Sequence, residues 1–300
     1  GINLAPPRNY LAAYPAGTHR NGTSNLNMTG FYDAAPNLVT VRLQNGEADI
    51  LTNFPAEVVV DVVGVYVPQP GAVSAGRYQD IKPIRVIDTR GFGSKPRAGS
   101  VTKVDVTGLI ALGKIDVDAT AISVNLTATE VDGSSFLTAY PFNERRGSTS
   151  SLNVVRGTDR AIGVIIKLKR EGSRFGFKVY CDAQTHFLVD VYGFFTGESA
   201  DRSTGGMFVP MDPVRLMDTR KGHGGKKRLW AGWTREFAIP GTVRAAAGTA
   251  VLNATVDRSM GAGYFTVNAA RERVGAPSTS SVNVRRGFQP APIGQQVSAF

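Results

Sequence analysis

The sequence predicts an all-β protein made of tandem, jelly-roll-like β-sandwich units with no significant helix. Three observations lead to this prediction. Short segments alternate polar with apolar residues, which is the period of a half-buried strand. Glycine is frequent, with 34 residues, and clusters of Ser, Thr and Asn supply further turn signals. The same motifs also recur at intervals of about 126–130 residues, so one structural unit is expected more than once.

The stretch from residue 84 to residue 195 holds eight segments with strand character, and turn residues such as Asp132-Gly133 and Arg156-Gly157 separate them. The segments are 84–90, 100–107, 119–130, 135–141, 148–155, 161–169, 174–181 and 185–195. Eight strands in about 120 residues favour a sandwich or a barrel, and we expect two packed sheets. No window predicts a helix of ten residues or more.

The repeat is visible in three pairs of segments. LAAYPAGTHRNGTSNLN at 11–27 returns as LTAYPFNERRGSTSSLN at 137–153, and a third version, FTVNAARERVGAPSTSSVN, occupies 265–283. VVVDVVGVY at 58–66 is echoed by FLVDVYGFF at 187–195, and SVNLTAT at 123–129 is echoed by VLNATVD at 251–257. Similar offsets in all three pairs indicate one repeated unit.

These offsets divide the chain into three units. Residues 76–197, here called the middle unit, hold every motif. Residues 1–68, the first unit, match the C-terminal part of a repeat, and residues 207–300, the third unit, match the N-terminal part. We therefore expect the chain to begin and end inside a repeat. Segments 69–78 and 197–207 are rich in Pro, Gly and Ser, as short linkers are.

An octapeptide occurs twice: PIRVIDTR at 83–90 returns as PVRLMDTR at 213–220. In an extended strand the Asp and Arg of each copy project from one face, where an arginine fork and backbone N–H groups can satisfy the carboxylate. A general base or metal ligand would need a second carboxylate or a His at a supporting spacing, and neither occurs in both units. We interpret the segment as a structural clamp. Its predicted residues are Arg85, Asp88, Arg90, Arg215, Asp218 and Arg220.

The ordered series P-x-R-x-x-D-T-R, N-x-T, a Tyr-Pro strand, S-T-S-S-L-N and V-D-V-Y-G-F-F runs through the chain. This series resembles the tandem β-repeats of large secreted and surface proteins of actinobacteria, and related segments in tail or virion proteins of their phages. The resemblance covers nearly the whole chain. It implies an all-β extracellular module and brings no catalytic residues with it.

The chain is basic, with 34 Lys and Arg against 24 Asp and Glu and a formal charge of +10. Two glycine-rich basic loops, at 91–99 and 221–232, follow the octapeptides. They lack the G-x-x-x-x-G-K-[ST] pattern of a nucleotide-binding loop, so they are either solvated turns or sites for an anionic cell-wall polymer or glycan. Aromatic rings can stack on sugars, although core packing is the expected place for at least one tryptophan. The candidate anion or glycan residues are Lys95, Arg97, Lys226, Lys227, Arg228, Trp230 and Trp233.

The function expected from these observations is a non-enzymatic extracellular structural protein that builds a cell-surface appendage, sheath or filament. Its expected partners are adjacent repeats or further copies of the chain, joined through strand edges. A cell-wall or glycan-binding adhesion module and a phage tail or virion-surface protein are the alternatives. Catalytic sequence patterns, metal-site spacing and cofactor motifs are not found, and neither is a nucleic-acid-binding sheet pattern. No apolar run reaches the roughly 18 residues of a membrane span.

Overall fold

The structure is a computed structural model of the 300-residue chain. It describes residues 9–18, 25–28, 36–41, 43–66, 70–208, 215–223, 228–237, 249–255, 260–261, 263–267, 282–284 and 292–298. The described part is an all-β fold, as predicted, with antiparallel sheets and one α-helix, α1 (Thr107–Ala111). No helix in this part is both long enough and apolar enough to cross a membrane.

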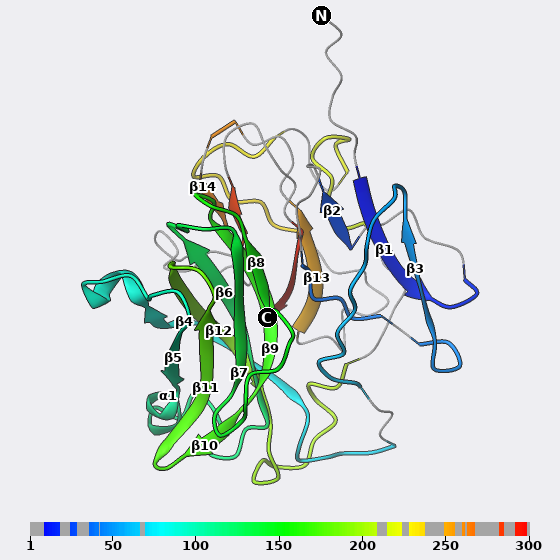
Figure 1. Ribbon diagram of the computed structural model, residues 1–300. Helices are drawn as coiled ribbons and strands as arrows, with labels where there is room; N and C mark the ends of the chain where they lie inside the picture. The colour runs from blue at the N-terminus through cyan, green and yellow to red at the C-terminus, as the bar shows by residue number, and fades with distance from the viewer. Residues whose placement is uncertain are drawn as a thin grey trace, which may run out of the picture.

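The middle unit is a β-sandwich of two antiparallel sheets (Figure 1). One sheet has the strand order β4-β12-β6-β9, and the other has the order β10-β11-β7-β8 with β5 paired to β11. Its strands are β4 (Tyr78–Asp88), β5 (Ser100–Asp105), β6 (Ala121–Thr129), β7 (Ser135–Pro141), β8 (Leu152–Val154), β9 (Arg160–Lys167), β10 (Lys169–Glu171), β11 (Arg174–Cys181) and β12 (His186–Phe195). The predicted segments 84–90 and 148–155 are therefore strands over only part of their length.

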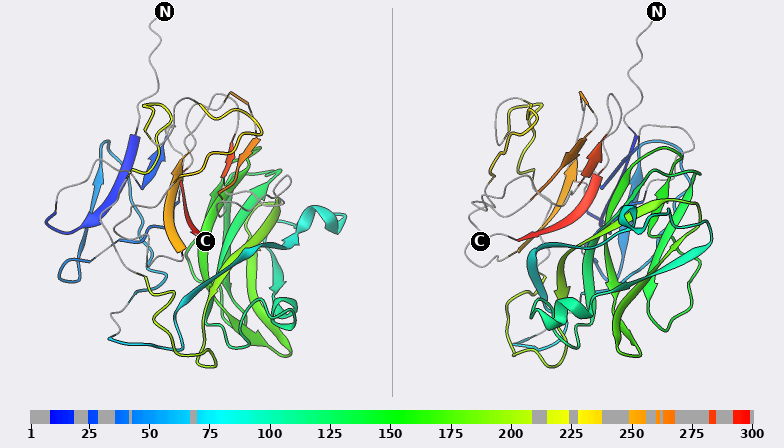
Figure 2. Two further views of the ribbon diagram at one scale, coloured as in Figure 1. Left: turned by 180° about the vertical axis from the view of Figure 1, so that it is seen from behind. Right: turned by 90° about the vertical axis from the view of Figure 1, so that its left-hand side faces the viewer.

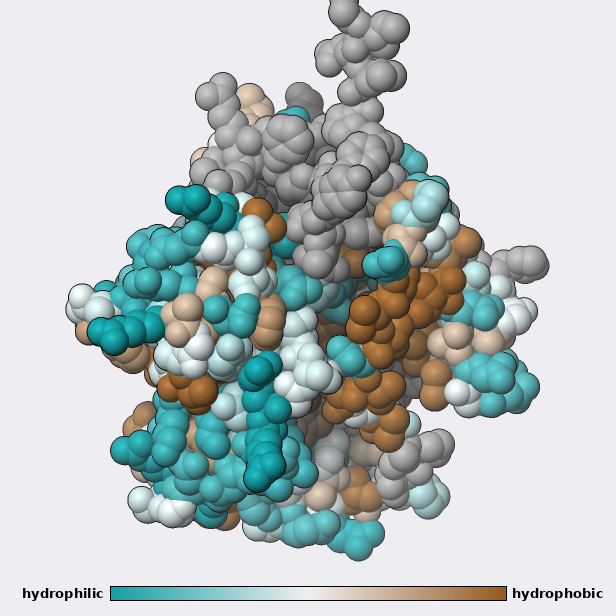
Figure 3. Space-filling view, viewed as in Figure 1, coloured by the Kyte–Doolittle hydropathy of each residue, from teal (hydrophilic) through white to brown (hydrophobic). Residues whose placement is uncertain are grey.

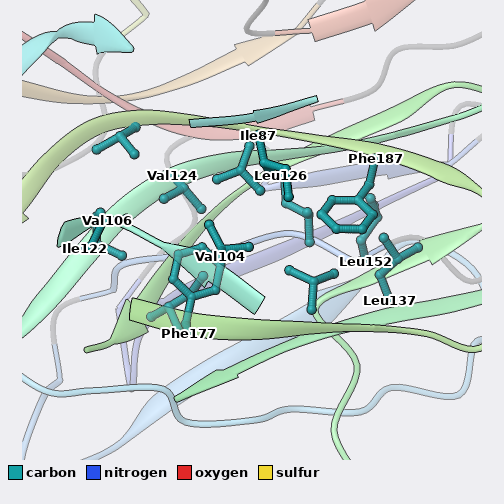
Figure 4. Close-up of a cluster of buried hydrophobic side chains, with 14 of the residues drawn as sticks. Ile87, Val104, Val106, Ile122, Val124, Leu126, Leu137, Leu152, Phe177 and Phe187 are labelled. Atoms are coloured by element: carbon teal, nitrogen blue, oxygen red, sulfur yellow. The ribbon is translucent and has the colours of Figure 1, made fainter. Parts of the chain in front are cut away.

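The core lies between the two sheets, where side chains from both layers meet (Figure 4). Alternation along β6 places Val124 and Leu126 in this core, with at most 1% of each residue exposed. Phe177 of β11 and Phe187 of β12 are fully buried in the same cluster. The period-2 pattern of SVNLTAT thus sets the inner face of a central strand.

On the outer face of the β4-β12-β6-β9 sheet, the side chains of the central strand β6 are polar but also buried. Ser123, Asn125 and Thr127 of β6 lie on this face, and none is more than 8% exposed. Strands β15 (Val282–Val284) and β16 (Pro292–Ser298) of the third unit lie against β9, and β16 also approaches β4 (Figure 2). The third unit therefore packs against this sheet.

The partial units repeat the strand pairings of the middle unit in the same register. In the middle unit Leu137 of β7 pairs with Leu152 of β8. The equivalent pairs are Leu11 with Leu26 in the first unit and Phe265 with Val282 in the third. These pairs join β1 (Asn9–Pro15) to β2 (Leu26–Met28), and β14 (Gly263–Phe265) to β15. The first unit adds β3 (Ala48–Thr52), which pairs with β1 as β11 pairs with β7.

A second pairing is also repeated. Asn125 of β6 faces Gly163 of β9 in the middle unit. In the third unit β13 (Thr249–Thr255) pairs with β16, and there Asn253 faces Gly294. The three units thus share not only motifs but also their alignment within the sheets.

Residues 58–66 are an exception to this agreement. Their sequence echoes β12, which predicts a buried strand, but here they form no regular secondary structure. Val59 is 85% exposed and Val62 is 80% exposed. Among the described residues no strand pairs with 58–66, whereas β4 and β6 hydrogen-bond to the two edges of β12.

Candidate functional site

The first Asp-Thr-Arg segment ends a strand and begins a turn. Strand β4 stops at Asp88, and Thr89–Phe92 form a 3-10 helix. The Asp88 carboxylate accepts the Arg90 backbone N–H at 3.1 Å and two guanidinium hydrogen bonds from the same residue at 2.9 and 2.5 Å. Asp88 therefore caps the turn. The expectation of a continuous strand over 84–90 is wrong, because this cap and the left-handed φ of +75° at Gly93 bend the chain.

Thr89 supplies the link from this turn to the last strand of the unit. It is fully buried, and its Oγ1 accepts the backbone N–H of Phe187 at 2.9 Å. The same oxygen lies 3.1 Å from Nδ1 of His186. Each residue of the Asp-Thr-Arg motif thus has a defined contact. Asp88 accepts hydrogen bonds from Arg90 and caps the turn, and Thr89 binds the backbone of β12.

Arg85 makes a longer connection, which the sequence pattern did not identify. Its guanidinium binds the Asp190 carboxylate through both oxygens, at 2.7 and 3.0 Å. The Asp190 side chain is 1% exposed, whereas Arg85 is 29% exposed. A buried carboxylate in an apolar strand requires such a partner. The available signal was the Asp in VDVYGFF, which recurs as Asp61 in the first unit.

Arg85 reaches this partner because of an irregularity in the sheet. Asp190 pairs with Arg85 and Val189 pairs with Ile87, so Val86 has no opposite residue in β12. This bulge lets Arg85 face the buried carboxylate while Ile87 remains in the core. It also brings Arg85 within 3.7 Å of Asp88, which a regular strand alternation would not predict.

The second copy of the motif has the same local geometry. Asp218 accepts the Arg220 backbone N–H at 3.1 Å and guanidinium bonds at 2.9 and 2.8 Å. Arg215 donates a longer hydrogen bond, at 3.4 Å, to Oδ2 of the same carboxylate. The six predicted residues therefore form two groups, each with one carboxylate between two arginines. Among the described residues, the two groups differ most clearly in their first arginine. Arg85 binds the buried Asp190, whereas its equivalent, Arg215, has a side chain that is 48% exposed.

These contacts predict an acid-sensitive stability. Hydrogen bonds from the arginines hold the pKa of Asp88 and that of Asp218 below the usual 3.8. Since both values are lower in the folded state, the stabilisation is complete above the unfolded pKa and is lost as the pH falls through the folded values. We expect thermal unfolding temperatures to drop below about pH 4. A double variant, Arg90→Ala with Arg220→Ala, should show a shallower drop.

The matched control for this experiment is Arg97→Ala with Arg145→Ala, which removes the same charge from exposed positions. Its acid dependence should follow that of the unmodified chain. Some acid dependence should persist in every variant, because the pKa values of Asp105, Asp118, Glu144 and Glu171 are also lowered. Identical slopes for the two double variants would contradict the clamp.

The predicted anion or glycan residues belong to two loops, and five of the seven fall within the described residues. Lys95 donates hydrogen bonds to Asp132 and to the Glu130 carbonyl, and its side chain is only 18% exposed. It is therefore less available to an anion than the sequence indicated. Arg97 is exposed on the same loop. Lys226 and Lys227 lie outside the described residues.

Both tryptophans are on the surface. Trp230 is 54% exposed and Trp233 is 61% exposed, so the expectation that at least one is a core residue is wrong. A turn with the Trp233 N–H bonded to the Trp230 carbonyl at 3.0 Å holds them close in the chain. Arg228 precedes this turn. These three exposed residues lie within six positions of the chain.

Arg77 is a further polar centre that sequence reasoning missed. Only 5% of the residue is exposed, and its guanidinium donates to the carbonyls of Val73, Gly205 and Asp201 at 2.9, 3.3 and 2.7 Å. Val73 belongs to the first linker and the other two belong to the second. Arg77 therefore ties together the two linkers that flank the middle unit. A lone Arg in a linker gives no sequence signal for this role.

Within the described ranges, no group of three or more His, Cys, Asp or Glu residues could hold a metal ion. Asp118 accepts hydrogen bonds from the backbone N–H and the hydroxyl of Ser199. Comparison with protein-family models, with curated proteins and with solved structures gives no match to this chain. Function must therefore be argued from the geometry alone.

Proposed function

We propose that this chain is a non-enzymatic extracellular structural protein, in which tandem β-sandwich units joined at strand edges build a surface appendage, sheath or filament. The observation that carries the proposal is the threefold recurrence of strand pairings in one register, with the pair Leu137–Leu152 repeated as Leu11–Leu26 and as Phe265–Val282. Copying a scaffold is how repeat proteins extend in one dimension.

The polar contacts support the same proposal. The charged residues of the repeated octapeptide bind one another in both copies, and in the first copy Arg85 and Thr89 also bind strand β12. Consecutive units are also coupled through their linkers, where Val73 and Ser203 exchange both backbone hydrogen bonds at 3.0 Å. Coupling of this kind limits the freedom of one unit relative to the next, as an extended assembly needs.

Electron microscopy of the purified chain at rising concentration tests this function. We expect an ordered polymer or sheet in which β-sandwich beads repeat. Dispersed particles at every concentration would contradict the proposal. A matched pair of variants locates the contact: Val101 lies in the edge strand β5 and is 48% exposed, whereas Val117 is outside any strand and 51% exposed. A lysine blocks pairing on an edge strand, so Val101→Lys should reduce assembly more than Val117→Lys.

A second function is favoured by a specific observation, the two exposed tryptophans beside Arg228. Aromatic faces and a cation are suited to an acidic glycan or cell-wall polymer. We expect the Trp230→Ala/Trp233→Ala variant to bind purified cell walls about tenfold more weakly in a sedimentation assay, with binding that also weakens as salt rises. Phe92→Ala, at an aromatic residue that is 57% exposed elsewhere, is the control. Equal binding by both variants would remove this function.

A further inference from the structure

Residues 58–66 carry the sequence of a central strand on the surface of the molecule. Their equivalents in the middle unit are 187–195 of β12, and all nine of those residues are buried. In 58–66, by contrast, five valines are more than 60% exposed: Val59, Val60, Val62, Val63 and Val65. Figure 3 shows a broad hydrophobic area on the side of the molecule where this part of the chain runs. Exposed apolar area of this kind marks an interaction site.

The third unit offers an edge that fits this segment. In the middle unit β6 pairs with β9 on one side and with β12 on the other. In the third unit β13 pairs with β16 in the same register, and among the described residues no strand pairs with the opposite edge of β13. Residues 215–220 reproduce the Asp88 turn, which in the middle unit borders β12. In the middle unit β12 fills the position between the equivalents of these two elements, β4 and β6.

One contact already joins the segment to this position. The rings of Tyr66 and Phe208 are stacked with centroids 4.5 Å apart. Their equivalents in the middle unit are Phe195 and Tyr78, which pair across β12 and β4 and whose rings lie 5.4 Å apart. The C-terminal end of 58–66 therefore contacts the third unit where β12 contacts the start of β4.

The path of the chain indicates that the two parts meet within one molecule. The first linker leaves residue 66 for the middle unit, and the second returns from residue 195 to residue 208. Val73 and Ser203 pair antiparallel, and Gly76 and Tyr78 donate backbone hydrogen bonds to Thr196 and Gly206. The two linkers therefore leave the middle unit side by side. Residue 66 and residue 208 are thus delivered to one place.

Polar groups in the third unit match the polar groups of the segment. Arg215 is equivalent to Arg85, and Asp61 is equivalent to Asp190, the partner of Arg85. Thr219 is equivalent to Thr89, whose hydroxyl accepts the N–H of Phe187, the residue equivalent to Val58. Thr89 is fully buried, whereas Thr219 is only partly buried. Each of these groups would find its counterpart if 58–66 lay in the β12 position.

We propose that residues 58–66 pair as a strand between residues 215–218 and β13 of the same chain, so that the first and third units complete one sandwich around an Asp61–Arg215 ion pair. The proposal rests on the strand-edge joining proposed above and names the strand, the edge and the register. The chain then consists of two bodies, the middle unit and this composite sandwich, connected by the paired linkers.

A disulfide test reads the register directly. Val189 pairs with Ile87, so the equivalent residues Val60 and Met217 should be opposite one another. The Val60→Cys/Met217→Cys variant, oxidised in dilute solution, should form an intramolecular disulfide in most molecules, as peptide mapping will show. Val65→Cys/Met217→Cys is the out-of-register control and should form at most a few per cent. Cys181 will not interfere, because burial raises the pKa of its thiol to about 12.

The outcomes separate this inference from the proposed function. Disulfide-linked dimers whose yield rises with concentration would overturn the same-chain strand but leave the structural function intact. No disulfide, or equal yields in the two variants, would overturn the docking itself. Absence of polymer by electron microscopy would instead contradict the structural function, whatever the disulfide result.

A second set of variants does not depend on cysteine chemistry. Asp61→Asn, Arg215→Gln and their combination are compared by the midpoint of urea unfolding, followed by tryptophan emission, because both tryptophans belong to the third unit. If the two side chains pair, the double variant should shift the midpoint no more than the larger single shift. Combining Asp61→Asn with Arg97→Gln, at an exposed residue of the middle unit, should give additive shifts. Additive shifts for Asp61 and Arg215 would contradict the ion pair.

Discussion

Arg85→Met should destabilise the middle unit by about 3–5 kcal/mol, because it leaves the Asp190 carboxylate buried without its cation. The Asp190 side chain is 1% exposed, and Arg85 binds both of its oxygens. A penalty of this size is a large part of the roughly 5–15 kcal/mol that stabilises a domain. Urea unfolding followed by far-ultraviolet circular dichroism will measure it.

The control for Arg85→Met is Arg145→Met, at an exposed arginine of the same unit. It should change the free energy of unfolding by no more than about 0.5 kcal/mol. A similar loss for both variants would mean that removal of positive charge, and not the stranded carboxylate, causes the effect. A loss below about 1 kcal/mol for Arg85→Met would show that water or another group satisfies Asp190 equally well.

Phe177→Ala should cost a similar amount, about 3–5 kcal/mol, for a different reason. Phe177 has no exposed surface and lies in the cluster between the two sheets (Figure 4). Its β11 backbone is fixed by strands on both sides, β5 and β7. The sheet therefore has little freedom to collapse into the cavity that the lost ring leaves. Urea unfolding of the purified variant gives the free energy.

Phe92→Ala is the matched control, because Phe92 is 57% exposed on the turn after Asp88. Its effect should stay within about 0.5 kcal/mol. If Phe177→Ala cost less than about 1.5 kcal/mol, the core between the sheets would be far looser than the structure indicates.

Much of the fold could be predicted from the sequence, because its signals are local. Alternation along SVNLTAT places Val124 and Leu126 in the core, and turn residues separate the strands at nearly the observed positions. The pairing of Asp88 with Arg90 was also predictable, since the two residues are only two positions apart in the motif. The end of strand β4 was predicted less well, because the Asp88 cap ends the strand earlier than the pattern alone indicates.

The contacts that could not be predicted are those between residues distant in the sequence. Arg85 and Asp190 are separated by 105 positions, and the bulge that lets them meet has no local signature. Arg77 depends on two linkers whose pairing is a property of the folded chain. The exposed segment 58–66 shows a limit of prediction from local patterns. An apolar sequence with strand character becomes a central strand only when two neighbouring strand edges are available to pair with it.

The central claim is that the Asp-Thr-Arg octapeptide is a scaffold that ties the first strand of a unit to its last. A double-mutant cycle on Arg85→Met and Asp190→Asn tests it most directly by urea unfolding. The account predicts strong coupling between the two residues. The double variant should lose at least about 2 kcal/mol less free energy of unfolding than the two single variants lose in sum. Losses that add to within about 0.5 kcal/mol would show that the two residues act independently and would contradict it.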